Sequence, residues 1–173
     1  MTLQASEGAL IRVDKLEKRY GNFTALGGIS FEVPRGQVLG FLGPNGAGKT
    51  TTMKILTCYL AASGGGAWVG GHDVAREPLA VRKLMGYLPE DTPIYPDMTA
   101  LEYLHFAGDI RGLSREEQRR RIGELAEICG LTRVLAKPVG QLSKGLRQRA
   151  GLAQALLHDP PILILDEPTR PRL

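Results

Sequence analysis

The octapeptide GPNGAGKT at residues 43–50 follows an apolar run at residues 38–42 and opens a stretch compatible with a helix. Its three glycines permit backbone conformations closed to other residues, so successive amide groups can turn inward around anionic phosphates. Lys49 supplies a positive charge for the terminal phosphates, and the first turn of the helix adds the positive end of its dipole. The order of strand, glycine-rich loop and helix therefore predicts a phosphate-binding loop within an α/β fold.

This loop contributes a run of candidate nucleotide-binding residues. Thr50 places a hydroxyl where it can ligate a magnesium ion. The alternative is an ordinary strand-to-helix turn with a surface lysine, and the flanking strand and helix patterns argue against it. The candidates are Gly43, Pro44, Asn45, Gly46, Ala47, Gly48, Lys49, Thr50 and Thr51.

A second apolar run, at residues 161–165, is followed directly by Asp166 and Glu167. Such a run is typical of a buried parallel strand, and ligands of open α/β sheets lie beyond the carboxyl ends of these strands. We therefore expect both carboxylates to point at the phosphate site. Asp166 would bind magnesium through water, and Glu167 would orient or deprotonate the water that attacks the γ-phosphorus. A solvated acidic turn is the alternative.

A third segment begins at Ser143, whose hydroxyl is placed to cap a helix that continues through residue 157. Gly145 allows a ligand to approach closely, and the helix presents its positive end to an anion. The segment thus predicts a second helix start that faces phosphate. The alternative is a capped amphipathic helix with basic residues in its first turns.

Together the three segments resemble the nucleotide-binding domain of ATP-binding cassette (ABC) proteins. GPNGAGKT resembles the Walker A motif, LSKGLRQR the signature motif and ILILDE the Walker B motif, in the family's order, over about residues 10–169. The resemblance implies a P-loop NTPase fold, in which a parallel sheet with flanking helices is joined by an antiparallel β subdomain and a helical insert at roughly residues 99–157. One such domain would span residues 1–173, and it is expected to be incomplete at its C-terminus, with the later strands missing.

The resemblance also implies contacts to nucleotide outside the phosphate loop. Tyr20 would stack on the adenine ring, and the alternative is a tyrosine that closes a turn at residues 21–22. Ser143 and Gly145 would contact nucleotide held by a second ATP-binding domain. A homodimer or a heterodimer is therefore implied.

The implied catalytic residues are Lys49 and Glu167. Glu90 stands where the family usually carries a glutamine that contacts magnesium, and a glutamate can still bind the metal. In the signature segment Lys144 replaces a usual glycine, which would weaken or rearrange the contacts to phosphate across the dimer.

The function implied by the resemblance is that of an ATPase, with ATP and magnesium as cofactors. The chain would be a subunit of an ABC-type transporter, its partner a transmembrane permease subunit, and ATP-driven dimer closure would power transport. A truncated fragment that binds ATP without competent hydrolysis and a non-transport ABC ATPase are the alternatives. No switch histidine follows Glu167, and ordinary surface positions are expected for His72, His105 and His158.

The composition suits one core, with 173 residues of which 43% are hydrophobic and 23% charged. No apolar run reaches membrane-spanning length, so we expect a cytoplasmic chain that reaches the inner face of the membrane through its partner. The formal net charge of +4 could suggest nucleic-acid binding, but basic residues alternate with acidic ones in a helix predicted after Ser114. We therefore expect no nucleic-acid partner.

Other elements follow from local patterns. Antiparallel strands are expected at residues 11–13, 29–33 and 67–69, and parallel strands at residues 38–42, 85–88 and 162–165. A helix at residues 50–60 would pack on the parallel strands. In the helix after Ser114, a capping box with Glu117 is expected, and the apolar stripe would consist of Ile122, Leu125, Ile128 and Cys129.

Overall fold

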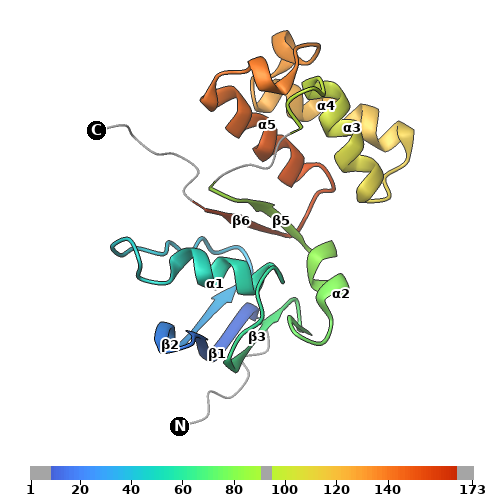
Figure 1. Ribbon diagram of the computed structural model, residues 1–173. Helices are drawn as coiled ribbons and strands as arrows, with labels where there is room; N and C mark the ends of the chain where they lie inside the picture. The colour runs from blue at the N-terminus through green and yellow to red at the C-terminus, as the bar shows by residue number, and fades with distance from the viewer. Residues whose placement is uncertain (1–8, 91–94, 167–173) are drawn as a thin grey trace. The chain divides into compact units, whose positions relative to one another are not determined.

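The computed structural model of the chain describes residues 9–90 and 95–166. The chain divides into two compact units, Met1–Leu84 and Met85–Leu173, and each unit has a β-sheet of its own (Figure 1). The antiparallel strands lie in the first unit and the parallel strands in the second.

The first unit is built on an antiparallel sheet with the strand order β2-β1-β3-β4. A two-residue turn joins β1 to β2, and Gly21 takes a φ of +55° there, a conformation open to glycine without steric cost. The antiparallel region predicted from the sequence is confirmed. Its strands are β1 (Ala9–Tyr20), β2 (Phe23–Pro34), β3 (Gly64–Val69) and β4 (His72–Asp73).

One face of this sheet forms the core of the first unit. Neighbouring residues of a strand point to opposite faces. In β3, Ala67 and Val69 are accordingly buried while Trp68 between them is more exposed, and Val13 of β1 is also fully buried. Helix α1 (Lys49–Leu56) contacts β2 and β3 and buries Ile55. The short helix α2 (Pro78–Lys83) follows β4. The antiparallel sheet therefore holds the helix that starts at the phosphate loop.

Residues 38–42 do not form the strand that the sequence predicts. Val38 and Leu42 are 100% and 96% exposed, and no strand in residues 9–90 or 95–166 pairs with this segment. A strand needs a neighbour to satisfy its backbone N–H and C=O groups, and an apolar composition does not supply one. Helix α1 also ends earlier than predicted, at Leu56 with Thr57 as its C-cap.

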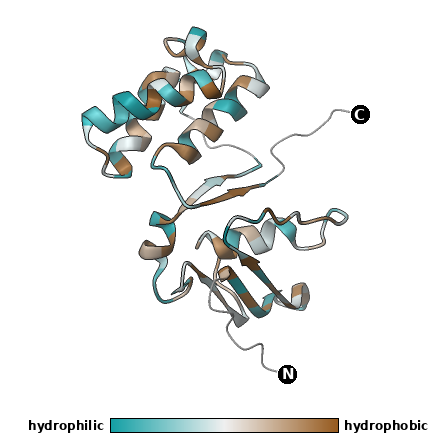
Figure 2. Cartoon of the chain, turned by 180° about the vertical axis from the view of Figure 1, so that it is seen from behind, coloured by the Kyte–Doolittle hydropathy of each residue, from teal (hydrophilic) through white to brown (hydrophobic). Residues whose placement is uncertain are grey.

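The second unit contains the parallel pair β5 (Met85–Leu88) and β6 (Ile162–Leu165). Figure 2 shows β6 as hydrophobic along its length. The Asp166 amide donates to the Leu88 carbonyl oxygen at 2.9 Å, so the pairing extends one residue past β6. These two predicted parallel strands are confirmed.

The rest of the second unit is helical. The capping box predicted at the start of α4 is confirmed, since the Ser114 hydroxyl accepts from the Glu117 amide at 3.3 Å and the Glu117 carboxylate accepts from the Ser114 amide at 2.9 Å. None of the helices in the described part of the chain has the length and apolarity needed to cross a membrane. The elements are α3 (Ala100–Ile110), α4 (Arg115–Ile128), α5 (Lys144–Leu156) and the 3-10 turns η1 (Thr132–Val134) and η2 (Val139–Gln141).

The apolar side of α4 packs into a cluster with Leu104 of α3. Ile122, Leu125 and Cys129 are buried there as predicted. Ile128 is 77% exposed, so its predicted place in the stripe is wrong. Residues three and seven positions after Ile122 share its face of the helix, whereas a residue six positions on points away from it.

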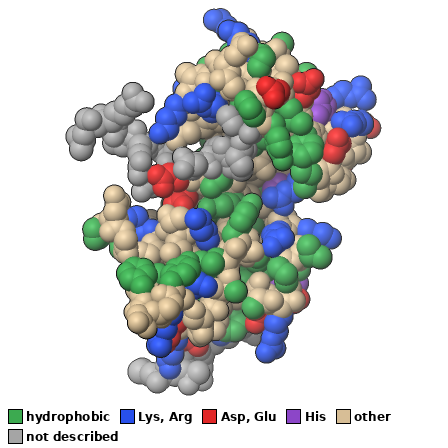
Figure 3. All heavy atoms as spheres, viewed as in Figure 1, with side chains coloured by type: hydrophobic (Ala, Val, Ile, Leu, Met, Phe, Trp, Pro, Cys, Tyr) green, Lys and Arg blue, Asp and Glu red, His purple; other side chains and the backbone are tan. Residues whose placement is uncertain are grey.

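On the face drawn in Figure 3, Lys and Arg are interspersed with acidic and apolar side chains. On α4, Arg120 and Arg121 each pair with Glu124 at 3.0 Å. The alternation of charge in the sequence thus becomes a set of ion pairs within one helix.

Candidate nucleotide-binding site

The phosphate loop lies between β2 and α1 in the first unit. Gly46 and Gly48 take φ values of +85° and +86°, in the left-handed region that side chains disfavour. A Cβ on Gly48 would also lie 2.7 Å from the Ala25 carbonyl oxygen and would press on the Leu26 side chain of β2. Both the turn of the loop and its contact with β2 therefore require a glycine at residue 48.

The start of α1 directs amide groups at the loop. The first backbone bond of the helix runs from the Thr52 amide to the Gly48 carbonyl oxygen at 2.8 Å. The amides of residues 49–51 come before this bond, and the N-cap residue, Gly48, has no side chain that could cap the helix. The positive end of the helix thus lies at the residues that the sequence assigned to phosphate.

Lys49 closes the loop on itself. Its Nζ donates to the carbonyl oxygens of Gly43 at 2.7 Å and Pro44 at 3.0 Å. The Ala47 amide donates to the Pro44 carbonyl oxygen at 3.2 Å and tightens the same curve. These bonds place the ammonium within the loop, where a bound phosphate would compete with the two carbonyls for it.

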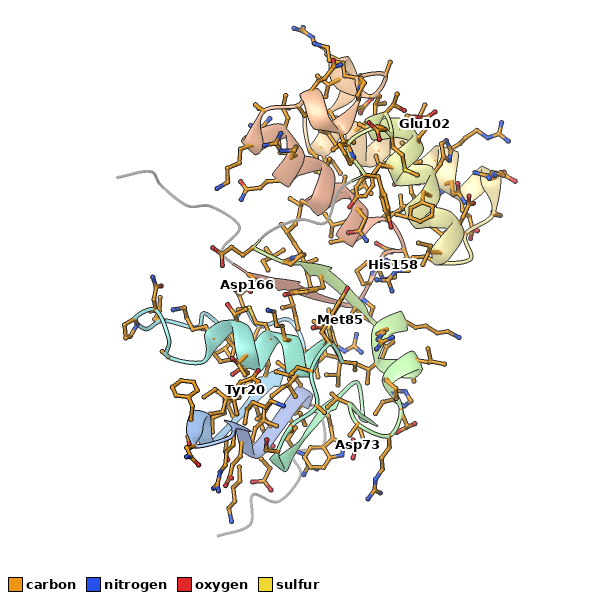
Figure 4. All side chains as sticks on the ribbon, in the orientation of Figure 1. Tyr20, Asp73, Met85, Glu102, His158 and Asp166 are labelled. Atoms are coloured by element: carbon orange, nitrogen blue, oxygen red, sulfur yellow. The ribbon has the colours of Figure 1, made fainter. Side chains whose placement is uncertain are left out.

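Tyr20 lies at the end of β1, beside the hairpin turn, with 49% of its surface exposed (Figure 4). The Nζ of Lys18 is 5.0 Å from the centroid of its ring and donates to the Ala61 carbonyl oxygen at 2.7 Å. Tyr20 borders the turn at residues 21–22, which also agrees with the alternative that this tyrosine closes the turn. Its half-exposed ring also remains available to stack on a flat ligand.

Glu90 and Asp166 follow the carboxyl ends of the paired strands β5 and β6. Because Leu88 lies opposite Leu165, both acids come within two residues of the same sheet edge. Asp166, labelled in Figure 4, is only 3% exposed, which contradicts the alternative of a solvated turn. The structure thus brings these two predicted magnesium ligands to one edge, while Glu167 lies outside the described residues.

Ser143 caps α5 as predicted, since its hydroxyl accepts from the Leu146 amide at 3.3 Å. A Cβ on Gly145 would meet no atom within 4 Å, so no neighbour among the described residues requires a glycine there. A glycine in a helix costs about 1 kcal/mol relative to alanine. The open space at Gly145 suits the close approach of another molecule.

The candidate residues are divided between the units. Tyr20 and residues 43–51 belong to the first unit, and Glu90, Ser143, Gly145 and Asp166 belong to the second. Among the described residues, no group of three or more His, Cys, Asp or Glu side chains could hold a metal ion. Magnesium commonly takes one or two carboxylates together with substrate phosphates and water. The carboxylate pair at the β5–β6 edge fits that chemistry.

Sequence reasoning missed two polar side chains, Lys18 and His158. His158 was expected at the surface but is half-buried, with its Nε2 3.2 Å from the Met85 carbonyl oxygen (Figure 4). Burial, and secondarily the Arg111 charge, lower the pKa of His158 to about 4, so the neutral ring donates this bond at pH 7. The sequence signal for the burial of His158 was its position four residues before the buried strand β6. The signal for the contact of Lys18 with Tyr20 was their two-residue spacing on one strand.

The sequence profile of the ABC transporter family matches residues 26–170. The chain belongs to the ABC transporter family. It is 43% identical to the uncharacterized ABC transporter ATP-binding protein YxlF of Bacillus subtilis (strain 168), over 92% of this chain and 52% of the relative. It is 42% identical to the daunorubicin resistance ATP-binding protein DrrA3 of Streptomyces coeruleorubidus, over 92% of this chain and 50% of the relative. A solved ATP-binding subunit of an ABC transporter superposes with a TM-score of 0.84 at 33% identity, covering 92% of this chain and 66% of that one.

The ABC membership and the α/β fold expected from the three motifs are thereby confirmed. The chain spans about half the length of the curated relatives it matches. The assignment of residues 1–173 to one ABC domain stays a prediction, as do the roles of the individual site residues.

Proposed function

We propose that the chain binds ATP with magnesium and hydrolyses it, as the ATP-binding subunit of an ABC-type membrane transporter. The observation that carries this proposal is the phosphate loop, in which two glycines in the left-handed region lead into α1 and Lys49 lies within hydrogen-bond reach of the loop's carbonyls. Membership of the ABC family supports ATP as the nucleotide and its hydrolysis as the reaction.

In this proposal amide groups of the phosphate loop and of the first turn of α1 surround the β- and γ-phosphates, and Lys49 neutralises the charge that develops on the transferred phosphoryl group. Tyr20 stacks on the adenine ring. Thr50, Glu90 and Asp166 supply the oxygen atoms for magnesium, which would add positive charge at the phosphates when bound. Their hydroxyl and carboxylate oxygens are the ligand types that magnesium prefers.

Hydrolysis in this proposal depends on Glu167. Its carboxylate accepts a hydrogen bond from the attacking water and orients it toward the γ-phosphorus. Asp166 precedes it at the end of β6 and is held by the bond from its amide to the Leu88 carbonyl oxygen. That bond holds the residue before Glu167 at the carboxyl end of β6, the edge at which the proposal needs an acidic residue.

Two partners belong to the proposal. A second ATP-binding domain, identical or not, would hold a nucleotide against Ser143 and Gly145, and the open space at Gly145 supports this contact. A transmembrane permease subunit would engage residues 92–99 and the helices that follow. Tyr95, which is 51% exposed and stacks edge-on against Phe106 of α3 at 5.2 Å, supports a contact surface there. Through this partner the chain would work at the inner face of the membrane.

The test is magnesium-dependent ATP binding and hydrolysis by the purified chain. Lys49→Ala should abolish both, while Lys54→Ala, at an exposed lysine on the same helix, should change neither. Glu167→Gln should retain binding and lose turnover. Binding that depends on Lys49 without any turnover would favour the alternative of a binding-only fragment. An ATP affinity that Lys49→Ala leaves unchanged would contradict the assignment of the phosphate loop.

A further inference from the structure

We infer that Lys18 is a positioning residue for adenine binding, which covers one face of the Tyr20 ring and leaves the other face for the base. The inference rests on the proposed function, because it requires ATP bound with its adenine on Tyr20. Lys18 itself would touch neither the base nor the phosphates, and it would act through the ring.

Lys18 and Tyr20 are two residues apart on β1 and therefore project from the same face of the strand. The Lys18 Nζ lies 5.0 Å from the centroid of the Tyr20 ring, within the range of a cation–π interaction. Tyr20 nevertheless remains 49% exposed. The ammonium thus fixes the ring without enclosing it.

The same ammonium ties the hairpin to the segment after α1, because it donates to the Ala61 carbonyl oxygen at 2.7 Å. Two further bonds reinforce this tie: the Arg19 amide donates to the Ser63 hydroxyl at 3.1 Å, and the Ser63 amide donates to the Glu17 carbonyl oxygen at 2.8 Å. The strand that carries Tyr20 is therefore tied to the segment that follows α1, the helix that starts at the phosphate loop.

The other strand of the hairpin reaches the loop directly. Gly48 lies against Ala25 and Leu26 of β2, only a few residues from the turn that Tyr20 borders. A strand rises about 3.3 Å per residue, so the two residues from Phe23 to Ala25 span about 7 Å. Tyr20 and Gly48 of the phosphate loop thus lie on contacting segments of the first unit, as one nucleotide spanning both would require.

The charge of Lys18 also suits the stacking partner. The face of an aromatic ring is electronegative, and a cation over one face draws electron density toward itself. The opposite face then repels the π-electrons of a stacked base less strongly. Because the ammonium also bonds to Ala61, its position is set by the backbone and does not depend on nucleotide.

The experiment measures the affinity of the full chain for two magnesium-bound probes, ATP and inorganic tripolyphosphate. Lys18→Met keeps the length of the side chain and removes its charge. It should weaken ATP binding about two- to fivefold, the strength of an exposed cation–π contact, and leave tripolyphosphate binding unchanged. Lys18→Arg keeps the positive charge and should therefore bind ATP as the unaltered chain does. Lys18→Gln serves as a second neutral variant if Lys18→Met does not fold.

A double-variant comparison separates positioning from general stability. On a Tyr20→Ala background, Lys18→Met should have no further effect on ATP binding, whereas a merely structural lysine would weaken binding equally in both backgrounds. Equal losses for ATP and tripolyphosphate, or no loss for ATP, would overturn the inference and leave the proposed function intact. A wild-type chain that binds neither probe, or binds both without Lys49, would overturn the proposed function and this inference with it.

Discussion

The two helix starts that the sequence assigns to phosphate, at α1 and at α5, are built in different ways. Helix α1 starts from Gly48 at a φ of +86° without a side-chain cap, whereas α5 starts from Ser143 in an extended conformation and its hydroxyl accepts the Leu146 amide. The start of α1 thus has no side-chain cap, whereas the start of α5 satisfies one of its own amides with the Ser143 hydroxyl. Two helix starts with similar sequence signals can therefore differ in how their first amide groups are satisfied.

The glycines at these starts differ in the same sense. A side chain at Gly48 would collide with β2, while one at Gly145 would meet nothing within 4 Å. The fold of the described residues thus requires the glycine of α1 but not that of α5, which in the proposed function is needed by a second molecule. Substitutions at the two ends should accordingly change stability with opposite signs.

The largest effect is expected for Gly48→Ala. Alanine at a φ of +86° is strained, and its Cβ would meet the Ala25 carbonyl oxygen at 2.7 Å. We expect the free energy of unfolding to fall by about 2–4 kcal/mol, since left-handed strain and overpacking add. Urea denaturation measures this loss, and calorimetry should show that ATP binding is lost with it.

Gly46→Ala is the matched control, because Gly46 takes nearly the same φ, +85°, but has no atom within 4 Å of a built Cβ. It should cost only about 1–2 kcal/mol, from left-handed strain alone. Equal losses for the two variants would show that the contact between Gly48 and β2 contributes nothing.

The two units are expected to differ in how strongly acid destabilises them. After α5, His158 bonds to Met85 and its pKa is lowered to about 4 by burial, then by Arg111 and Arg121, against the opposing Asp159 charge. The unfolded chain, with a histidine pKa near 6.5, binds this proton more readily, so stability present above pH 6.5 is lost as the pH falls toward 4. For a half-exposed ring, screening leaves about 1–2 kcal/mol of this effect.

Hydrogen exchange at pH 7 and pH 5 would locate the loss. The faster exchange at pH 5 should appear in β5 and α5 and not in the first unit. There, the pKa of Glu77 is held below its ordinary 4.5, mainly by its hydrogen bond with His72, so Glu77 stays ionised at pH 5. His158→Gln should remove the histidine's share of this loss. The loss from Glu102 and Glu117, whose pKa values are held below 4.5 by their bonds to Thr99 and Ser114, should remain at the acid end of the range. An acid-induced loss that spares the second unit would contradict the assignment.

The cap of α5 is expected to matter less. Ser143→Ala removes the acceptor of the Leu146 amide and should lower the free energy of unfolding by about 1 kcal/mol. Ser143→Asp keeps a capping oxygen, so denaturation should show near-normal stability. In the proposed function its negative charge would nevertheless repel the phosphates of a nucleotide held by a second domain, and hydrolysis should fall. Unchanged hydrolysis in Ser143→Asp would argue against that contact.

Much of this architecture could be predicted from the sequence, because its signals are local. The glycines of GPNGAGKT, the short strand patterns at residues 11–13 and 67–69, and the cap residues Ser114 and Ser143 each act on their own neighbours, and the structure bears them out. The parallel pair β5 and β6 was recognisable because each strand is a short apolar run followed by an acidic or turn residue.

What could not be predicted depends on partners distant in sequence. Residues 38–42 are as apolar as β6, but the composition of the run does not say whether a neighbouring strand is present to accept its hydrogen bonds. The burial of His158 depends on Met85, which is 73 residues away in sequence, and the contact of Lys18 with Ala61 spans 43 residues. Such contacts exist only once the fold has formed.

The smallest effect is expected for Gly145→Ala, and its sign is the opposite of that for Gly48→Ala. Alanine fits the helical backbone and the open space at this position, so the free energy of unfolding should rise by about 0.5 kcal/mol. Gly123→Ala on α4 is the matched control, since Gly123 is also helical and also has nothing within 4 Å of a built Cβ. Both variants should gain stability in urea denaturation. Only Gly145→Ala should lose ATP hydrolysis, because its methyl group would occupy the space that the proposed second domain needs for its nucleotide. If both variants keep full turnover, the glycine of α5 serves no second molecule, and the two helix starts would have in common only their resemblance in sequence.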